Sequence, residues 1–431
     1  MYTAPEFSDW VCKPWKHDDS SFQGLEIAGL SHDTRTLQKG DVYIAIRGEN
    51  YDGHDFVEQA VEKGAVGVIV EREFPALGKP QLIVSNALEA LWLIAAGARS
   101  TWAGTVIGIT GSAGKTTVKE MVAAVLSQKG AVAKTRGNWN NDIGLPLSMI
   151  AAERTADFFV FELGMNHPGE IDPLASLLRP DWALITNIGK AHIEFFQGLE
   201  PAVSGDGFFA RAMEGIANEK AAILKHAEHA VLNQDSEWFD RLNATFDGTP
   251  VHLTEQEFSI AQPGEYMRLN TRFAATIGLE LGLTREAVQA GLDTFVSVPM
   301  RWQQVQKDGV LFINDAYNAN PLSMRAALST FFEMECNGRK WVVLGGMHEL
   351  GEATEKEHCS LGEFIDTLLF DRVLTVGELG AKIVCRGELG LEKSAAVERL
   401  REQLQAGDIV LLKASRSERL ETILEEFNTE F

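Results

Sequence analysis

Short apolar runs alternate along the chain with longer runs in which apolar positions recur every three to four residues. The alternation is clearest after residue 300, and it is typical of a parallel β-sheet covered by helices. The strand-like runs there are 310–315, 340–346, 371–377 and 408–415. The helix-like runs are 321–334, 357–370, 394–404 and 417–427. Ligands of such sheets bind beyond the carboxyl ends of the strands, where this sequence has polar clusters at 315–320, 345–349 and 415–417.

The pattern restarts at two places, which divides the chain into three parts. The first part mixes strand-like runs with helix-like runs, at 41–48, 54–65, 67–70, 81–84 and 87–100. An apolar strand then begins near residue 105, and the last series begins near residue 300. A chain of 431 residues has room for about two to four domains. We therefore predict three α/β domains, at 1–98, 99–298 and 299–431.

The stretch GITGSAGKTT, residues 108–117, lies between two of these elements. An apolar strand, Thr105–Thr110, precedes it, and the apolar positions 118, 121, 122, 125 and 126 behind it predict one face of a helix that ends at Gly130. The usual phosphate-loop spacing, G-x-x-x-x-G-K-[ST], is not met, because Ile109 stands five positions before Gly114. The context still favours a phosphate site at a helix N-terminus over a purely structural turn. Lys115 could then reach the terminal phosphates, and Thr116 could bind Mg²⁺.

Two further apolar strands end in polar residues. Glu162 ends DFFVFELG, and Asn187 and His192 follow the apolar part of DWALITNIGKAH. If both strands flank the strand before the loop, Glu162 and His192 meet at its phosphates, where each could hold a Mg²⁺ ion. The alternatives are a salt-bridged strand end for Glu162 and a surface or capping histidine for His192. Lys220, at the start of a predicted helix, reads by itself as a solvated lysine.

The net charge and the cysteines exclude several classes of partner. The chain has 39 basic and 61 acidic residues, a net charge of −22, which argues against binding to nucleic acid or to anionic membranes. Its four cysteines are scattered, as expected for free thiols in a reducing compartment. We see neither a signal peptide nor an apolar run long enough to insert into a membrane. These features predict a cytoplasmic protein that acts on small molecules.

Together these segments resemble those of the Mur ligase family. The loop GITGSAGKTT is similar to that family's T-G-x-x-G-K-[ST] form. Further resemblance lies in HDTRTLQKGDVYIAIRGENYDGHDF, GNWNNDIGLPL, FELGMNHPGEI, DAYNANPLSMRAAL, HELGE and KASRS, which occur in all three parts of the chain. The resemblance implies a small α/β UDP-binding domain, a central P-loop-type parallel-sheet ATPase domain and a C-terminal doubly wound Rossmann-like domain.

The resemblance also implies an activity in peptidoglycan synthesis. It suggests an ATP-dependent ligase that adds D-alanyl-D-alanine to UDP-N-acetylmuramoyl-tripeptide through an acyl phosphate; the alternative is a related ligase with another amino-acid or peptide acceptor. The sequence has no D-N-P-R segment, which related ligases adding diaminopimelate carry, and this favours the dipeptide. The third residue of the tripeptide, lysine or diaminopimelate, is left open. A monomer is expected, with ATP and two Mg²⁺ ions.

The resemblance implies binding, metal-ligand or catalytic roles for particular residues. The UDP-sugar site would comprise Asp33, Thr34, Arg35, Asn50, Asp52 and His54. The nucleotide site would comprise Gly111, Ser112, Ala113, Gly114, Lys115, Thr116, Thr117, Asn187, Arg301, Asp315, Tyr317, Asn318 and Asn320. Asn138, Asn140 and Asn141 would face the muramoyl peptide, and Ser415 and Arg416 the acceptor. The metal ligands would be Thr116, Glu162, His192 and a carbamylated Lys220. Lys115, His192, Lys220 and Arg301 would be catalytic.

Three features depart from the family pattern. Ala113 stands where the family often has asparagine, Gly346 stands where it usually has aspartate, and residues 201–215 look like an insertion before Lys220. They keep open a rival hypothesis, a nucleotide-binding protein that has lost catalysis. An ordinary P-loop kinase or GTPase would be expected to carry the full loop motif and would give no reason for the third domain.

Overall fold

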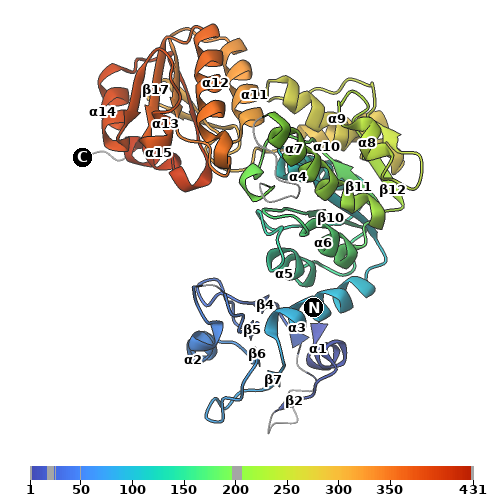
Figure 1. The fold of residues 1–431 in the computed structure, drawn as a ribbon. Helices are drawn as coiled ribbons and strands as arrows, with labels where there is room; N and C mark the ends of the chain where they lie inside the picture. Colours follow the sequence, from blue (N-terminus) through green and yellow to red (C-terminus); the bar gives the residue numbers. More distant parts are fainter. Residues whose placement is uncertain (1, 17–23, 25, 49, 197–205, 429–431) are drawn as a thin grey trace.

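The computed structural model describes the chain except for residues 1, 17–23, 25, 49, 197–205 and 429–431. Three larger sheets follow one another along the sequence, and Figure 1 shows three lobes with the central lobe between the other two. The α/β class and the three-part architecture predicted from the sequence are confirmed. The first part of the predicted insertion, 201–205, lies outside the described residues. Among the residues described, no helix is long and apolar enough to cross a membrane.

The first sheet belongs to the N-terminal lobe. Its strand order is β2 (Trp15–Lys16), β7 (Gln81–Ile83), β6 (Gly67–Val70), β5 (Val42–Ile44) and β4 (Leu30–Ser31), parallel except for β2. Strands β1 (Tyr2–Thr3) and β3 (Glu26–Ile27) pair separately. The helices are α1 (Ala4–Val11), α2 (Val57–Glu62) and α3 (Ala87–Ser100). The buried face of α3 belongs to one apolar core with Phe159 and Phe161 of the central lobe, so this helix joins the two lobes firmly.

The central sheet is fully parallel. Its order is β13 (Val251–His252), β12 (His229–Leu232), β11 (Trp182–Ile185), β8 (Thr105–Thr110), β10 (Phe158–Glu162) and β9 (Val132–Lys134). The helices are α4 (Lys115–Leu126), α5 (Gly144–Ile150), α6 (Ile171–Leu178), α7 (Asp206–Ala221), α8 (Phe239–Asn243), α9 (Glu265–Glu280) and α10 (Arg285–Asp293). Strands β10 and β11 flank β8 on its two sides, as the convergence of Glu162 and His192 required.

Two details of the central lobe differ from the sequence prediction. The predicted apolar face of α4 is buried, but the helix ends at Leu126, because i→i−3 bonds from Gln128 and Lys129 tighten its last turn before Gly130. Lys220 lies at the end of α7 and not at the start of a helix. The chain therefore already runs as a helix from Asp206, within the stretch that was predicted to be an insertion.

The third sheet carries helices on both faces. Its order is β14 (Gln303–Lys307), β15 (Val310–Asn314), β19 (Ile409–Lys413), β16 (Lys340–Leu344), β17 (Arg372–Val376) and β18 (Glu388–Leu391), with only β14 antiparallel among these pairs. One apolar core lies under α11 (Pro321–Glu333) and α12 (Thr354–Thr367). The other lies under α14 (Lys393–Gln403) and α15 (Glu421–Asn428); α13 is Gly377–Gly380. The predicted doubly wound fold is confirmed. Strand β14 was missed because four of its five side chains are polar and none is fully buried.

The connection between the central and C-terminal lobes has an unusual backbone. Met300 (φ 59°) and Trp302 (φ 52°) adopt the left-handed conformation on either side of Arg301, which is uncommon for side chains of this size. The backbone N–H of Trp302 donates to Oδ1 of Asp315 at 3.1 Å, and that of Met300 to Oε1 of Gln303 at 3.0 Å. Side chains of the third lobe therefore fix the conformation that presents Arg301.

Candidate active site

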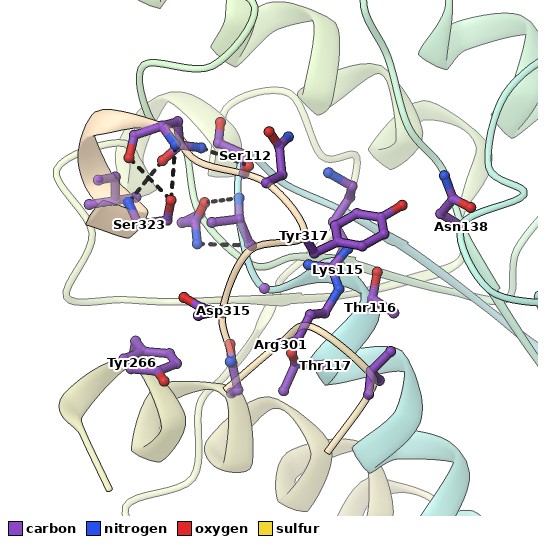
Figure 2. A pocket seen from close by; sticks show the side chains of 18 of the residues that line it. Ser112, Lys115, Thr116, Thr117, Asn138, Tyr266, Arg301, Asp315, Tyr317 and Ser323 are labelled. Carbon is purple, nitrogen blue, oxygen red and sulfur yellow. Dashed lines mark hydrogen bonds between the residues drawn. The ribbon is translucent and has the colours of Figure 1, made fainter. Parts of the chain in front are cut away.

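A cavity of about 440 Å³ lies between the central and C-terminal lobes. It is lined by the loop after β8, by Asn138–Asn141, by the ends of β10 and β11, by α9 and by residues at the start of the C-terminal lobe. Figure 2 shows Lys115, Arg301 and Tyr317 gathered in its middle, with Tyr266 toward one end and Asn138 toward the other. Of the predicted nucleotide-site residues, all but Gly111 line this cavity.

Two glycines allow the loop its shape. Gly111 (φ 150°) and Gly114 (φ 81°) have backbone angles that side chains rarely adopt. A Cβ at Gly111 would lie 1.9 Å from Oγ1 of Thr186, and one at Gly114 would lie 2.8 Å from Oδ1 of Asn270. Helix α4 begins directly behind, without a side-chain cap. The N–H groups of its first turn are therefore free to receive an anion.

The loop is clamped by the end of β11. The amide of Asn187 receives the N–H of Ala113 at 2.9 Å and donates to its carbonyl at 3.1 Å. Thr186 donates to the same carbonyl at 2.6 Å, and the Ser112 hydroxyl donates to the carbonyl of Gly189 at 3.0 Å. The clamp holds the backbone of residue 113, so it does not depend on which side chain stands there. Asn187 was predicted as a cofactor contact, and in this structure its amide holds the loop.

Glu162 is buried beside the loop, with 1% of its surface exposed. Its Oε2 accepts the Thr116 hydroxyl at 2.8 Å, and its Oε1 accepts the Asn140 amide at 2.8 Å. A hydroxyl and a carboxylate side by side form the oxygen donor set that Mg²⁺ prefers, with water and substrate phosphates as its other ligands. The described residues contain no cluster of three or more histidine, cysteine, aspartate or glutamate side chains arranged for a metal, and Thr116 and Glu162 are the pair whose hydroxyl and carboxylate oxygens adjoin at the loop.

Three cationic groups lie near one another at the loop. Lys115 donates to the carbonyl of Gly111 at 2.9 Å. Burial lowers the pKa of Lys115, although the Glu162 carboxylate raises it and Arg301 lowers it further. The guanidinium of Arg301 lies 4.0 Å from the ring centre of Tyr317, and its Nε is buried with no hydrogen-bond partner among the residues that the structure describes. Positive charge from both lobes therefore converges where phosphates would lie.

Lys220 is the third of these groups, and its side chain is almost fully buried. Burial lowers the pKa of Lys220 well below that of an exposed lysine, and the charge of Lys115 lowers it further. The solvated-lysine alternative is therefore wrong. Lys220 does not line the cavity itself but lies behind it, close enough to Lys115 for their charges to interact.

His192 makes its contact across the lobes. Its Nδ1 lies 2.6 Å from Oε2 of Glu349, a residue of the HELGE segment that received no role from the sequence. The bond to His192 holds the pKa of Glu349 below its usual range. The N–H of Glu194 also donates to the carbonyl of Glu349, at 3.3 Å. His192 is thus at the cavity, as predicted, with a carboxylate partner that pattern reading missed.

Asp315 and Asn320 lie at the cavity with structural partners. Lys413, a buried residue of the KASRS segment, donates to Oδ2 of Asp315 at 2.6 Å, and this partner was also missed. Asn320 caps α11, and its amide also donates to the Ser112 carbonyl at 3.3 Å. Asn318 receives the N–H of Ala319 at 2.8 Å. The joint at 315–320 therefore both starts α11 and touches the phosphate loop.

Further residues of the cavity were not anticipated. Asn270 and Tyr266 lie on α9, and burial raises the pKa of Tyr266 well above its usual value. Asn270 is buried on α9 together with Thr271 and Thr276, and an amide among mostly apolar positions is the sequence feature that could have indicated it. Asn138, Asn140 and Asn141 line the cavity, and Oδ1 of Asn141 also receives the N–H of Gly144, the first residue of α5, at 2.8 Å.

Ser415 and Arg416 do not line the cavity. The Ser415 hydroxyl donates to the Ala319 carbonyl at 3.2 Å and receives the N–H of His348 at 3.0 Å. Arg416 pairs with Glu421 at 2.6 Å. Nearby, Gly346 has no room for the aspartate that the family pattern favours, since a Cβ there would lie 2.3 Å from Cβ of Leu379. In this structure these residues organise the sheet edge of the C-terminal lobe.

The residues predicted for the UDP sugar lie in the N-terminal lobe and outside this cavity. Arg35 binds Asp33 with two nitrogens, and this bond lowers the pKa of Asp33 to about 2. Thr34 donates to Gln59 at 2.7 Å, and Asn50 is exposed. The His54 ring is buried between Asp52, at 2.6 Å, and the N–H of Glu71, at 2.9 Å. Both ring nitrogens of His54 are therefore already occupied within the lobe.

Known proteins match the whole length of the chain. Residues 26–99 match the family model described as Mur ligase family, catalytic domain; residues 109–275 match the Mur ligase middle domain; and residues 300–416 match the Mur ligase, glutamate ligase domain. A UDP-N-acetylmuramoyl-tripeptide–D-alanyl-D-alanine ligase of Bacillus subtilis is 35% identical over 94% of both chains. The protein of that name from Escherichia coli is 34% identical over 94% of this chain and 95% of its own.

Solved structures show the same likeness. MurF from Acinetobacter baumannii superimposes with a TM-score of 0.84 at 29% identity, covering 99% of this chain and 98% of its own. MurF ligase from Thermotoga maritima, solved in complex with ADP, gives a TM-score of 0.78 at 28% identity, covering 93% of this chain and 96% of its own.

Proposed function

The chain belongs to the Mur ligase family, and we propose that it joins D-alanyl-D-alanine to UDP-N-acetylmuramoyl-tripeptide while ATP is converted to ADP and phosphate. Two relatives that carry this activity in their names are similar over almost their whole length. A similar protein has been solved with ADP, which supports ATP as the nucleotide. The product is the pentapeptide precursor of peptidoglycan.

The reaction needs an activated carboxylate. Hydroxide is too poor a leaving group for direct condensation with an amine at neutral pH. Transfer of the γ-phosphoryl group from ATP to the tripeptide carboxylate gives an acyl phosphate and ADP. The free amine of D-alanyl-D-alanine then attacks the acyl carbon, and phosphate leaves from the tetrahedral intermediate. Catalysis of such a transfer rests on positioning the groups and on neutralising the charge that develops on the phosphoryl oxygens.

The residues of the cavity suit these two tasks. The open N–H groups at the start of α4 would hold the phosphates, and Lys115 would neutralise charge on them from the central lobe. Arg301 would do so from the C-terminal lobe, oriented by the ring of Tyr317. Asn138, Asn140 and Asn141 would face the muramoyl peptide. Asp315, Tyr317, Asn318 and Asn320 would surround the ribose and base, with Lys413 fixing Asp315.

Mg²⁺ would be held by Thr116 and Glu162, with His192 at a second ion. Bound there, the ions would stabilise negative charge on the transferred phosphoryl group. Lys220 would serve as a carbamate. The lowered pKa of Lys220 supports this role, because only a neutral amine can add carbon dioxide. The carbamate would turn a buried neutral amine into an anionic ligand.

The observation that carries the proposal is the convergence of Lys115 and Arg301, from two lobes, beside the Thr116–Glu162 pair. An isolated nucleotide-binding domain would need no arginine from a second lobe. We further propose domain boundaries at 98/99 and 298/299, a UDP site around Asp33–Arg35, and an acceptor site near Ser415 and Arg416. We also propose that the protein is a monomer and that it acts in the cytoplasm, where ATP and UDP-sugars are available.

Phosphate release measured with Mg²⁺-ATP and UDP-N-acetylmuramoyl-tripeptide, with and without D-alanyl-D-alanine, tests the function. Release that requires both substrates, with the pentapeptide seen by mass spectrometry, is expected. Release only with another amino acid or peptide would favour a related ligase. Tight ATP binding without release under every combination would favour a nucleotide-binding protein without catalysis. Parallel assays with lysine and with diaminopimelate in the third position identify the tripeptide.

A further inference from the structure

Lys119 is a buried lysine that the mechanism above does not use. It lies on α4, one helical turn after Lys115, and its side chain is 0% exposed. Its ammonium donates to the carbonyls of Thr135 and Gly137, each at 3.0 Å, and lies 3.0 Å from Oε1 of Glu120. An ammonium has three protons, and three acceptors surround this one. A buried charge is tolerated only with such partners.

The two carbonyls belong to the segment that follows β9. This segment leads to the asparagines of the cavity, and most of its side chains are exposed, although Trp139 packs partly buried against the apolar core that α3 shares with the central lobe. Gly137 has a left-handed backbone (φ 51°), as a tight turn requires. Lys119 therefore supplies a buried polar attachment of this mostly exposed loop to the nucleotide-binding helix, in addition to the packing of Trp139.

The same loop holds Glu162 from two sides. The Thr135 hydroxyl receives the N–H of Glu162 at 2.9 Å, and the Asn140 amide donates to its Oε1 at 2.8 Å. The carbonyl of Asn140 in turn receives the N–H of Gly164 at 2.8 Å. A shift of the loop would therefore displace the asparagines and the carboxylate together.

We propose that Lys119 is a positioning residue that ties the segment 135–141 to α4, so that the surface facing the UDP-linked substrate is set by the helix that binds the nucleotide. The choice of substrate rests on the proposed function. The role of Lys119 in ordering the loop is independent of the proposed function, because the order of the loop can be measured without turnover.

Hydrogen exchange of the free protein tests the attachment directly. In Lys119→Met, which removes the ammonium and keeps an apolar stem, amides of 135–141 are expected to exchange about tenfold faster, as for one lost charge-assisted hydrogen bond. Lys119→Arg keeps cationic donors and should restore part of the protection of these amides against exchange. If the methionine variant does not fold, the arginine variant is compared with the wild type in its place. Lys134→Met is the matched control, because Lys134 is exposed and pairs with the same Glu120.

Kinetics provide the second readout. In Lys119→Met the KM for the UDP-linked substrate should rise about tenfold, whereas the Kd for ADP without Mg²⁺ should change less than about twofold, because the start of α4 is untouched. Unchanged exchange in Lys119→Met, or equal effects of Lys134→Met, would overturn the proposal. A wild-type enzyme that is inactive with this substrate would refute the proposed function instead, and the exchange data would still decide the role of Lys119.

Discussion

Nδ1 of His192 in the central lobe lies 2.6 Å from Oε2 of Glu349 in the C-terminal lobe, and both residues hold a left-handed backbone, with φ angles of 59° and 63°. Such a conformation costs on the order of 1 kcal/mol for a residue other than glycine. It therefore persists only where other contacts favour it. The strain on both sides of one contact indicates that the two loops are shaped to meet when the lobes are close.

Replacing Glu349 by glutamine should weaken the contact between His192 and residue 349 that joins the two lobes. The pair is partly exposed, so its contribution is about 1 kcal/mol or less, up to a fivefold shift toward separated lobes. Small-angle scattering of the free variant should give a larger radius of gyration than the wild type, and kcat should fall about two- to fivefold. ATP and the UDP-linked substrate together should compact both proteins. Glu355→Gln, an exposed carboxylate on α12, is the control; identical scattering of wild type and Glu349→Gln would contradict the expectation.

Lys115→Met should lower kcat by about a thousandfold or more. The ammonium would be lost from the place where phosphoryl charge develops, and removing one such donor commonly costs this much. Phosphate release under saturating substrates measures the effect. Lys129→Met, at an exposed lysine after the same helix, should keep wild-type activity. Turnover by Lys115→Met at the wild-type rate would rule out the proposed phosphate site.

Glu162→Gln tests the metal site. The amide can still receive a hydrogen bond from Asn140 and donate one to Thr116, so the side chain should stay in place without its charge. The Mg²⁺ concentration for half-maximal activity should rise about tenfold or more, and kcat should fall about a hundredfold. Binding of ADP without Mg²⁺ should be unaffected. An unchanged Mg²⁺ dependence would exclude Glu162 as a ligand.

Lys220 should carry a carbamate that depends on pH. Because its pKa is lowered, its amine is neutral over a wider pH range than an exposed lysine and can add carbon dioxide; as the pH falls through that lowered pKa, the amine gains a proton and the carbamate is lost. With ¹³C-bicarbonate, the wild type should show a carbamate signal by NMR. Bicarbonate should stimulate activity more at about pH 6 than at about pH 8. Neither effect is expected in Lys220→Met, and a wild type without the signal would refute the role.

Asp33 should contribute to stability only above acidic pH. Arg35 lowers its pKa to about 2, below about 3.9 in an unfolded chain. The contribution is therefore complete above about pH 4 and is lost as the pH falls toward 2. Asp33→Asn should unfold at a lower urea concentration than the wild type at about pH 7, and this difference should shrink at about pH 3. Arg35→Gln should show the same pH dependence. If the difference in urea midpoint between variant and wild type does not vary with pH, the Asp33–Arg35 pair does not stabilise the fold in this way.

Local sequence determined most of the fold. Apolar strands such as Thr105–Thr110 must be buried on both faces, and helices with one apolar face, such as α4, must cover them. The glycines of GITGSAGKTT identified the phosphate loop, because few other residues adopt the required backbone angles. Edges and ends were less predictable: four of the five side chains of β14 are polar, and α4 ends where backbone hydrogen bonds tighten its last turn, which no side chain in the sequence indicates.

The tertiary structure alone decided which groups meet. Glu162 and Thr116 are 46 positions apart, and His192 and Glu349 lie in different lobes, so their contacts depend on strand order and on how the lobes pack. Burial is equally a property of the whole fold. It separates Lys119 and Lys220, which are buried, from Lys129 and Lys134, which are exposed, although all four are the same residue. The sequence determines which chemical groups a side chain carries. The packing of the folded chain determines the neighbours of that side chain and its burial, and therefore its protonation state and its function.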